Sequence, residues 1–340
     1  MDLSRTVASV IVLNYNGRHF LEGCLASLEA QRFHDFEAWL VDNGSQDGSV
    51  EFVADRFPWV RVMTLGQNLG FCAGNNAAIK QAKGDFIVLL NNDTVVEPEW
   101  LGALVGAAQE DPRVGICASR ILSLHRPDLI YAAGDCYSIA GHAFRRGEGL
   151  GAAGRFEKAE EVFTACACAA LYRRSMLDEI GLLDEDFFSN CEDVDLGFRS
   201  RLGGYSCLYV PEAVVYHFGS GTAGVKNARV EFLDSRNIEY VFFKNMPGLL
   251  LLQYLPLHVM LLSRTFAQRL PEGLAVAFLR GKADFLANLL RVVRKRRIIQ
   301  RRRKVQVQAL ARAMDRRFIS RVLKKLVRWH LIPRSLTDVT

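Results

Sequence analysis

Three polar side chains follow an apolar run near position 90 and could hold a metal ion. Residues 86–90 (FIVLL) predict a fully buried strand, and Asn91, Asn92 and Asp93 come directly after it. The carboxyl end of a parallel strand faces the ligand crevice of an open α/β sheet. An acid there can hold a divalent cation against a diphosphate, because such cations bind carboxylate and phosphate oxygens. These residue types also favour turns, and the motif by itself leaves a simple turn open.

Two further predicted strands end in polar residues that could reach the same crevice. Residues 7–13 are followed by Asn14, and residues 36–41 by Asp42. The carboxylate of Asp42 could accept a hydrogen bond from the ring N–H of uracil or thymine. The alternative is an Asx turn, in which Asp42 bonds to the backbone that follows it. Asn14, Asn92 and Asp42 are therefore candidates for binding a nucleotide.

A second acidic group begins a helix that is predicted over residues 192–202. Glu192, Asp193 and Asp195 all lie in its first turn. The helix dipole favours acids at this end, and capping alone would explain them. Asp195 also precedes Arg199 by four residues, which is the spacing of an ion pair along one helix face. We assign Asp195 to structure on that basis.

The elements that must position these residues alternate between strand and helix patterns. Strands separated by helices of about ten residues predict an α/β fold with a mostly parallel sheet and right-handed crossovers. Residues 128–154 are Gly-rich and predict a loop-hairpin region over one edge of the site. Strands are expected at 7–13, 36–41, 60–65, 85–90, 114–118, 164–172, 206–210 and 213–217, and helices at 19–30, 49–56, 72–82, 98–110, 174–180 and 192–202.

The eight cysteines include no CxxC pair and no Cys/His spacing of a metal site. Cys166 and Cys168 alternate along the strand expected at 164–172, and we interpret the cysteines as small buried residues. The first six residues are mostly polar, and no signal peptide is evident. These features indicate a reduced, cytoplasmic protein.

The C-terminal part differs from the rest in charge and hydropathy. From residue 280 onward, 19 Lys and Arg against three Asp give a net charge of +16, and the whole-chain net of +6 leaves −10 for the remainder. Residues 245–263 hold no formal charge but contain two prolines, which disfavour a regular spanning helix. With the basic clusters at 294–297 and 301–304, this segment predicts peripheral attachment to one leaflet of an anionic membrane surface.

Four motifs in the first hundred residues resemble those of one enzyme family. They are residues 10–16 (VIVLNYN), 41–49 (VDNGSQDGS), 68–76 (NLGFCAGNN) and 90–94 (LNNDT). Each motif is weak alone, but the ordered set resembles family 2 of the inverting glycosyltransferases, and most of all its rhamnosyltransferase-like branch. The resemblance covers residues 7–245.

The resemblance implies a GT-A fold, described as a Rossmann-like sheet flanked by helices, and a nucleoside-diphosphate sugar as donor. It assigns Asp42 to the nucleotide base and Asp93 to the metal of the DXD motif. Asn91 and Asn92 stand where this motif usually has aspartates, and a lower metal affinity is therefore expected. His217 could be a packed residue at a strand end, but the resemblance implies that it joins Asp93 on Mn²⁺ or Mg²⁺.

The resemblance also implies that Glu192 and Asp193 belong to the acceptor site, with Asp193 as general base. We expect Glu192 to orient the acceptor or a neighbouring backbone segment. A sugar hydroxyl is a poor nucleophile and needs a carboxylate within hydrogen-bond reach. The metal neutralises the leaving diphosphate, and attack from the opposite side inverts the anomeric centre. Asn76 is a candidate contact to the donor sugar, with helix capping as the alternative. Candidate phosphate contacts are Ser220, Thr222 and Lys226.

The predicted protein is an inverting, metal-dependent glycosyltransferase attached peripherally to the inner face of the cell membrane. Its expected donor is dTDP-L-rhamnose, and its expected acceptor is a lipid-linked sugar or a polysaccharide. Residues 1–244 form the expected catalytic domain, with a nucleotide-sugar half (1–120) and an acceptor half (121–244). Residues 245–340 form the expected membrane-associating region of apolar and basic helices.

Two other functions compete with this prediction. A nucleotidyltransferase would share the nucleotide-binding architecture, but residues 14–17 after the first strand are not a Gly-rich, basic phosphate loop. A nucleic-acid-binding protein could use the basic tail. The cations of the tail lie beside Leu, Val and Phe at helical spacing, however, and this combination suits anionic lipid better. We therefore expect no nucleic-acid partner.

Overall fold

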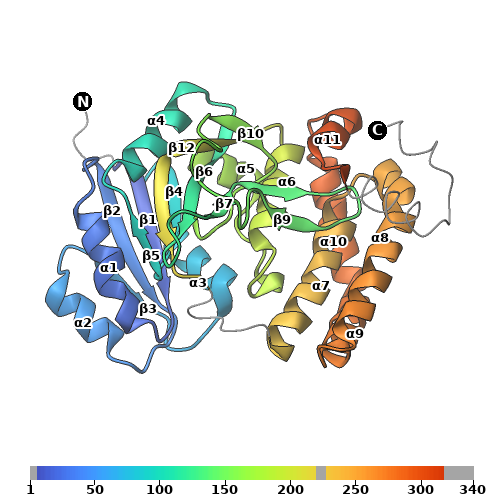
Figure 1. Cartoon of the computed structure of the whole chain (residues 1–340), viewed down its shortest axis with the longest axis horizontal. Coiled ribbons are helices and arrows are strands. Elements are labelled where there is room, and N and C mark those ends of the chain that lie inside the picture. Colours follow the sequence, from blue (N-terminus) through green and yellow to red (C-terminus); the bar gives the residue numbers. More distant parts are fainter. Residues whose placement is uncertain (1–5, 220–226, 318–340) are drawn as a thin grey trace.

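In the part of the chain that the structure describes, ten strands form one mixed sheet and two more form a hairpin (Figure 1). The computed structural model describes residues 6–219 and 227–317. The strands are β1 (Ala8–Asn14), β2 (Phe36–Asp42), β3 (Arg61–Thr64), β4 (Phe86–Asn91), β5 (Thr94–Val96), β6 (Val114–Ser123), β7 (Ile130–Ala133), β8 (Asp135–Tyr137), β9 (Ala143–Arg145), β10 (Glu160–Val162), β11 (Ala169–Arg173) and β12 (Ser206–His217). The sheet has the order β10-β12-β6-β11-β4-β1-β2-β3, while β5 pairs with β12, β7 with β6, and β8 with β9.

Helices cover both faces of the sheet and build the C-terminal end of the molecule (Figure 1). They are α1 (Arg18–Glu29), α2 (Ser49–Arg56), α3 (Gly70–Ile79), α4 (Trp100–Glu110), α5 (Arg174–Ile180), η1 (Glu185–Phe187), α6 (Glu192–Leu202), α7 (Ala228–Asn245), α8 (Gly248–Arg269), α9 (Ala275–Ala287), α10 (Leu289–Arg301) and α11 (Val307–Ala313). α1, α2 and α4 share one apolar core with the sheet, and a second core extends from β1 to α11. This second core includes residues on both sides of positions 120 and 244. The expected domain limits at these positions remain predictions.

The N-terminal half of the sheet is parallel, as the alternating pattern predicts. β4, β1, β2 and β3 run side by side in the same direction. Strands that are buried on both faces need continuous apolar sequences, and β1 and β4 have them. The pairing sets Asn14 opposite Asp42 and Leu13 opposite Asn91. The carboxyl ends of β1, β2 and β4 therefore share one edge, where their polar residues meet.

The other half of the sheet departs from a purely parallel order. β11 is antiparallel to both of its neighbours, β4 and β6, and β12 is parallel to β6. The strands expected at 206–210 and 213–217 are one strand, β12, with a shift of register in its pairing to β6. β5 pairs with the end of β12 and sets His217 opposite Thr94. This pairing brings a late part of the chain beside the turn that follows β4.

The strand expected at 164–172 begins later, as β11. Residues 165–168 lead into it as a loop and turn, and Cys166 and Cys168 therefore do not alternate along a strand. The reason is that the backbone N–H of Ala167, in this turn, donates to the carboxylate of Asp193 in the first turn of α6 and not to a neighbouring strand.

α7 has no counterpart among the elements that the sequence predicts. The side chain of Asn227 caps it by accepting two backbone hydrogen bonds. The helix buries the charged residues Glu231, Glu239 and Lys244. An amphipathic helix is recognised by an uninterrupted apolar stripe, and these buried charges break it.

A buried polar group ties α7 to its neighbours. Glu239 lies 2.9 Å from Nε2 of His258 in α8 and 2.6 Å from Nζ of Lys282 in α9. The other ring nitrogen of His258, Nδ1, donates to the carbonyl of Ala140 at 2.8 Å. Ala140 lies in the loop between β8 and β9. The group thus fastens α8 both to the helices and to the β8-β9 hairpin.

α8 is a continuous helix, although its prolines disfavour one. Pro247 lies at the N-cap, where its missing N–H costs nothing, and Pro256 lies within the helix. α8 is long and apolar enough to cross a membrane by length and composition, and 22% of its most apolar window is buried inside the structure. The structure does not show a membrane location.

The basic clusters of the tail are not wholly free, in contrast to the expected basic membrane helices. In α10, Lys295 pairs with Asp184 and Asp186, and Arg296 donates to two backbone carbonyls at the end of α7 at 2.7 and 2.6 Å. Part of the positive charge therefore holds α10 against the body of the protein. The exposed cations of the two clusters are Arg294, Arg297, Arg301, Arg302 and Lys304, and the last two contact Glu179.

Candidate active site

Asp93 and His217 come together at the carboxyl edge of the sheet. Asp93 lies in the turn between β4 and β5, and His217 ends β12. Their Oδ1 and Nε2 atoms are 3.1 Å apart, and the two residues are only 6% and 4% exposed. The pairing of β5 with β12 and a bond from the Phe218 N–H to the Asp93 carbonyl (3.0 Å) fix this contact. The structure therefore brings together the two residues that were predicted to share a metal.

The chemistry of this pair fits a divalent cation. The 3.1 Å separation is that of a hydrogen bond, and it sets one carboxylate oxygen and one imidazole nitrogen side by side at the carboxyl edge of the sheet. A carboxylate and an imidazole suit Mn²⁺, and two protein ligands leave positions for diphosphate oxygens. Among the described residues, Nδ1 of His217 has no hydrogen-bond partner, while the ring of Tyr131 packs edge-on at 4.5 Å between centroids. The imidazole ring of His217 is therefore held by its contact with Asp93 and by packing against Tyr131.

Asn14 and Asn92 form a chain of hydrogen bonds beside this pair. Asn92 Nδ2 donates to Asn14 Oδ1 at 2.7 Å, and Asn14 Nδ2 donates to Ser45 Oγ at 3.1 Å. A side chain at Gly17 would place its Cβ 2.1 Å from Asn92 Nδ2, and the backbone can pass over the amides only because that residue is glycine. The two asparagines lie on neighbouring strand ends, but their predicted contact with the nucleotide remains a prediction.

Asp42 makes the Asx turn that was the alternative to nucleotide binding. Its Oδ2 accepts hydrogen bonds from the N–H groups of Gly44 (3.2 Å) and Ser45 (3.1 Å). Each carboxylate oxygen has more than one lone pair, and the turn leaves capacity for a further donor. The predicted bond to a nucleotide base therefore also remains a prediction.

Asn76 has structural partners at each of its polar atoms. Its Nδ2 donates to Leu183 O (2.8 Å) and to Glu185 Oε1 (3.0 Å), and its Oδ1 accepts from Leu183 N (3.2 Å). These bonds hold α3 to the segment before η1. The contact to a donor sugar remains untested. Ser220, Thr222 and Lys226, the candidate phosphate contacts, lie outside the described residues.

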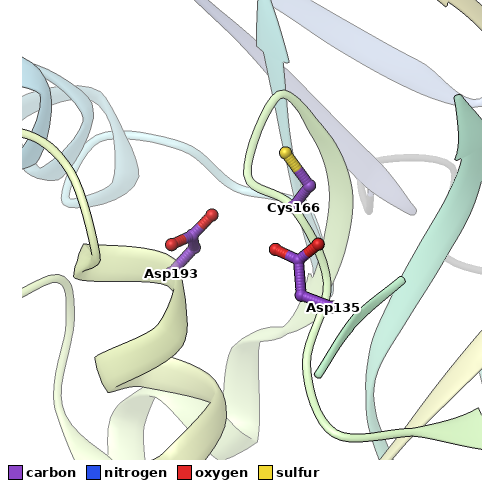
Figure 2. A group of neighbouring side chains, drawn as sticks. All are labelled: Asp135, Cys166 and Asp193. Carbon is purple, nitrogen blue, oxygen red and sulfur yellow. The ribbon is translucent and has the colours of Figure 1, made fainter. Parts of the chain in front are cut away.

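Asp193 lies at the start of α6 with its carboxylate held by backbone groups. It accepts hydrogen bonds from Val194 N (2.8 Å) and Ala167 N (3.1 Å). Asp135 and Cys166 approach it from β8 and from the loop before β11, and one ligand atom of each lies within 4.8 Å of the others (Figure 2). Three separate segments therefore meet at the predicted base.

Burial sets the protonation of this cluster. It raises the pKa of Asp193, and it raises those of Asp135 and Glu192 well above the ordinary range, where nearby negative groups add to the effect. A general base works best when its pKa approaches the working pH. A hydrogen bond with Cys168 lowers the pKa of the partly exposed Cys166 to about 7. The interpretation of every cysteine as a small buried residue is wrong for Cys136, Cys166 and Cys191, which are only partly buried.

Asp195 has the structural role that its spacing predicts. Its carboxylate lies 2.8 Å from Arg199 Nε and 2.7 Å from Lys244 Nζ, and it accepts a hydrogen bond from Asn245 Nδ2 at 2.7 Å. Burial alone would raise the pKa of Asp195, but Lys244 and Arg199 outweigh it and hold the pKa below its usual range. Asp195 therefore links α6 to α7.

Tyr131, Arg145 and Asp135 also lie at the site, although no sequence pattern indicates them. Tyr131 packs against His217, and the guanidinium of Arg145 lies 4.3 Å from the centre of the Tyr131 ring. The carboxyl of Asp135 belongs to the Asp193 cluster. All three come from the Gly-rich segment 128–154, whose composition indicated only a loop-hairpin over the site. Periodicity and spacing give no signal for them.

Sequence comparison gives one family and several relatives. Residues 9–181 match the family described as "Glycosyl transferase family 2". An N-acetylglucosaminyl-diphospho-decaprenol L-rhamnosyltransferase of Mycobacterium tuberculosis is 30% identical over 241 residues, which are 64% of this chain and 78% of that protein. The O-antigen biosynthesis protein RfbC of Myxococcus xanthus is 30% identical over 224 residues, but the match covers only 17% of its length.

Solved structures share the fold at low sequence identity. GalNAc-T7 with UDP, GalNAc and Mn²⁺ aligns with a TM-score of 0.61 and 15% identity over 85% of this chain and 58% of its own. A mannosyltransferase from Pyrobaculum calidifontis, in complex with GDP-Man and Mn²⁺, has a TM-score of 0.51 and 16% identity over 84% and 88% of the two chains. At such identities the likeness shows the fold alone.

Proposed function

The chain belongs to glycosyl transferase family 2, and from this premise we propose that it is an inverting, metal-dependent glycosyltransferase. The prediction of the family, of the GT-A fold and of a glycosyltransferase is confirmed. The observation that carries the finer proposal is the contact of Asp93 with His217, a candidate metal site, on segments that Tyr131 and Arg145 link to the hairpin beside the partly buried carboxylate of Asp193.

In the proposed reaction Asp193 takes the proton from the attacking hydroxyl of the acceptor. Its two backbone hydrogen bonds hold the carboxylate in one orientation, and its raised pKa favours proton transfer near neutral pH. Glu192 orients the acceptor next to it. A Mn²⁺ or Mg²⁺ ion, held by Asp93 and His217, would neutralise the charge of the leaving diphosphate. Attack from the face opposite this leaving group inverts the anomeric carbon.

For the donor we propose dTDP-L-rhamnose, and for the acceptor a lipid-linked sugar or a polysaccharide. The support is the mycobacterial relative, which is named as an L-rhamnosyltransferase acting on a diphospho-decaprenol-linked sugar. Asp42 is assigned to the ring N–H of the thymine, with Asn14 and Asn92 beside it. Because the chain belongs to glycosyl transferase family 2, we set aside the alternative of a nucleotidyltransferase.

The test of the reaction is transfer by the purified full-length protein in detergent with Mn²⁺. dTDP-, UDP- and GDP-sugars are offered with a GlcNAc-diphospho-lipid acceptor, and the product is examined by NMR. We expect transfer from dTDP-L-rhamnose with inversion of the anomeric centre. Preference for a UDP- or GDP-sugar would replace the donor, and retention of configuration would exclude the mechanism.

We also propose that the protein attaches peripherally to the cytoplasmic face of the membrane. Most of the exposed large apolar side chains in the described part of the chain belong to α8, α9 and α10 or lie next to them. Leu249, Leu252 and Leu290 are 76%, 70% and 75% exposed. Apolar area with exposed cations nearby is the combination that binds anionic bilayers, and each such leucine contributes on the order of 1 kcal/mol when partly inserted.

Replacement of Leu249, Leu252 and Leu290 by Ser tests this attachment in the full-length protein. We expect binding to vesicles that contain phosphatidylglycerol to fall roughly 100-fold, because about 1 kcal/mol is lost at each position. Turnover on a soluble acceptor should not change. Leu150→Ser is the matched control, since Leu150 is exposed but lies outside the helical region. Equal vesicle binding by both variants would refute the attachment surface.

A further inference from the structure

We propose that Asp135 is a second acceptor-binding residue, which acts with Asp193 by donating a hydrogen bond from its carboxyl group to the acceptor sugar. The inference rests on the proposed function, because it takes Asp193 as the general base. It assigns a role to a residue that no motif of the sequence indicates.

The backbone fixes the position of Asp135. It is the first residue of β8 and is paired with Arg145 of β9. It also exchanges backbone hydrogen bonds with Thr164, at 2.8 Å from the Asp135 N–H and 3.2 Å from the Thr164 N–H. Held from both sides, its side chain extends toward Asp193 and Cys166 (Figure 2). The position of this carboxyl therefore does not depend on a flexible loop.

Asp135 has a buried oxygen without a partner. The residue is 6% exposed, and its Oδ1 forms no hydrogen bond within residues 6–219 and 227–317. Buried polar atoms are nearly always paired, and such an exception calls for a ligand or another explanation. Oε2 of Glu192, next to Asp193, is buried in the same condition. Two unsatisfied oxygens around the predicted base indicate a site that a polar ligand completes.

The spacing suits a sugar hydroxyl. Oxygen atoms of Asp135 and Asp193 lie within 4.8 Å of each other. Hydrogen bonds between oxygen atoms are about 2.7 Å long, and one hydroxyl oxygen can therefore reach both carboxyls. Asp193 is only partly buried, which leaves the cluster open to an incoming acceptor.

The surrounding charges divide the two carboxyls into one base and one donor. Asp135 faces Asp193 on α6, Cys166 in the loop before β11, Arg145 on β9 and Glu148 after it. Burial raises the pKa of Asp135 well above its ordinary range, the anionic groups raise it further, and Arg145 opposes them. Asp193 has two backbone N–H donors that favour its ionised form. A coupled pair of this kind loses its protons in two steps, and Asp193 ionises first.

The complementary roles follow from this order. With Asp193 ionised and Asp135 protonated, the acceptor hydroxyl can give its proton to Asp193 and accept a hydrogen bond from Asp135. Asp135 forms no covalent bond and exchanges no proton during transfer. The same three side chains could instead hold a metal ion, but that would require both carboxylates to be ionised, and the two arrangements therefore differ in their dependence on pH and metal.

The test compares Asp135→Asn with Asp135→Ala in the full-length enzyme. The Asn side chain keeps a neutral donor of the same shape, and we expect its kcat/KM for the acceptor near pH 7 to stay within about threefold of wild type. The Ala variant should raise the acceptor KM roughly tenfold or more, with the donor KM unchanged, because a hydrogen bond to the ligand is lost. An equal loss in both variants would overturn the proposal.

The pH profile gives a readout that a merely structural role would not change. At high pH the wild type should lose acceptor kcat/KM as Asp135 ionises, and Asp135→Asn should lack this alkaline limb. Cys166→Ser controls for the nearby thiol and should keep the limb. The proposal would be overturned if the alkaline limb persisted in Asp135→Asn. It would also be overturned if the Mn²⁺ dependence of Asp135→Asn differed from that of the wild type.

Asp193→Asn in the same assay separates this proposal from the proposed mechanism. Loss of turnover in Asp193→Asn together with wild-type acceptor kinetics in Asp135→Ala would overturn only the role of Asp135. Normal turnover in Asp193→Asn would overturn the mechanism itself. If the Ala variant fails to fold, Asp135→Asn alone decides, through its pH profile and its acceptor KM.

Discussion

The proposed donor side and the proposed acceptor side of the site differ in how their polar atoms are satisfied. On the donor side, Asn92 bonds to Asn14, Asn14 bonds to Ser45, and Asp42 closes its own turn. On the acceptor side, the buried Asp135 and Glu192 each retain an oxygen that has no partner within residues 6–219 and 227–317. Apart from Nδ1 of His217, the donor-side groups named here bond within the protein, whereas these two acceptor-side carboxyls have room for a partner that a substrate would supply.

The largest effect should come from Asp193→Asn on the acceptor side. Removal of the proton acceptor should lower kcat roughly 10²- to 10⁴-fold, the usual contribution of general-base catalysis. Binding of the donor nucleotide, measured by calorimetry, should not change. Weakened donor binding with normal kcat would place Asp193 on the donor side. The proposed division of the site into a donor side and an acceptor side would then fail.

The pH profile of the wild type is a second test of Asp193 as the general base. Burial raises the pKa of Asp193, and a base loses its function when it is protonated. Activity should therefore fall as the pH drops through this raised pKa, at a higher pH than about 4, the usual value for an exposed aspartate. An acid limb at or below pH 4 would contradict a raised pKa of Asp193.

On the donor side, His217→Ala should raise the Mn²⁺ concentration for half-maximal activity roughly 10- to 100-fold, the range found when the environment of a bound metal is disturbed. Asp93→Ala should raise this Mn²⁺ concentration further, because it removes the only carboxylate of the turn between β4 and β5. His34→Ala, at an exposed histidine, is the control. An unchanged metal titration of His217→Ala would make His217 a packing residue.

The smallest effect is expected at Asp42. Asn also forms Asx turns, and Asp42→Asn should preserve the turn and the thermal unfolding midpoint. If Asp42 also binds the thymine ring N–H, affinity for dTDP should fall about three- to tenfold, since a charged acceptor is stronger than a neutral one. Asp47→Asn alters another acid of the same loop, which bonds to Ser49 and Arg18, and should leave dTDP affinity unchanged. Equal affinities would leave Asp42 with the turn alone.

Local patterns predict the donor side well. The buried strands β1, β2 and β4 end within a residue or two of their predicted ends, because a continuous apolar run followed by polar residues marks the end of a buried strand. The contact of Asp93 with His217 required the resemblance to a family, since 124 positions separate the two residues. The physical cause of this contact is the pairing of β5 with β12, which sets His217 opposite Thr94.

The acceptor side and α7 were beyond sequence patterns for definite reasons. Asp135, Cys166 and Asp193 belong to three segments, and their meeting depends on a hairpin and a turn whose geometry has no periodic signal. α7 is hidden because Glu239 and Lys244 occupy buried positions of the helix. The basic clusters of the tail were predicted to meet an anionic membrane surface, but Lys295 of the first cluster pairs with Asp184 and Asp186 within the protein.

The contact of His258 with Ala140 has a consequence for which hydroxyls the enzyme can reach. Ala140 follows β8, which carries Asp135, and His258 lies on α8, one of the helices proposed to rest on the bilayer. If α8 rests there, this bond and the Glu239 contacts set a fixed height of the acceptor site above the lipid surface. The enzyme would then select its target partly by distance. A hydroxyl nearer to the lipid, or several sugars farther from it, would be missed even when its chemistry is right.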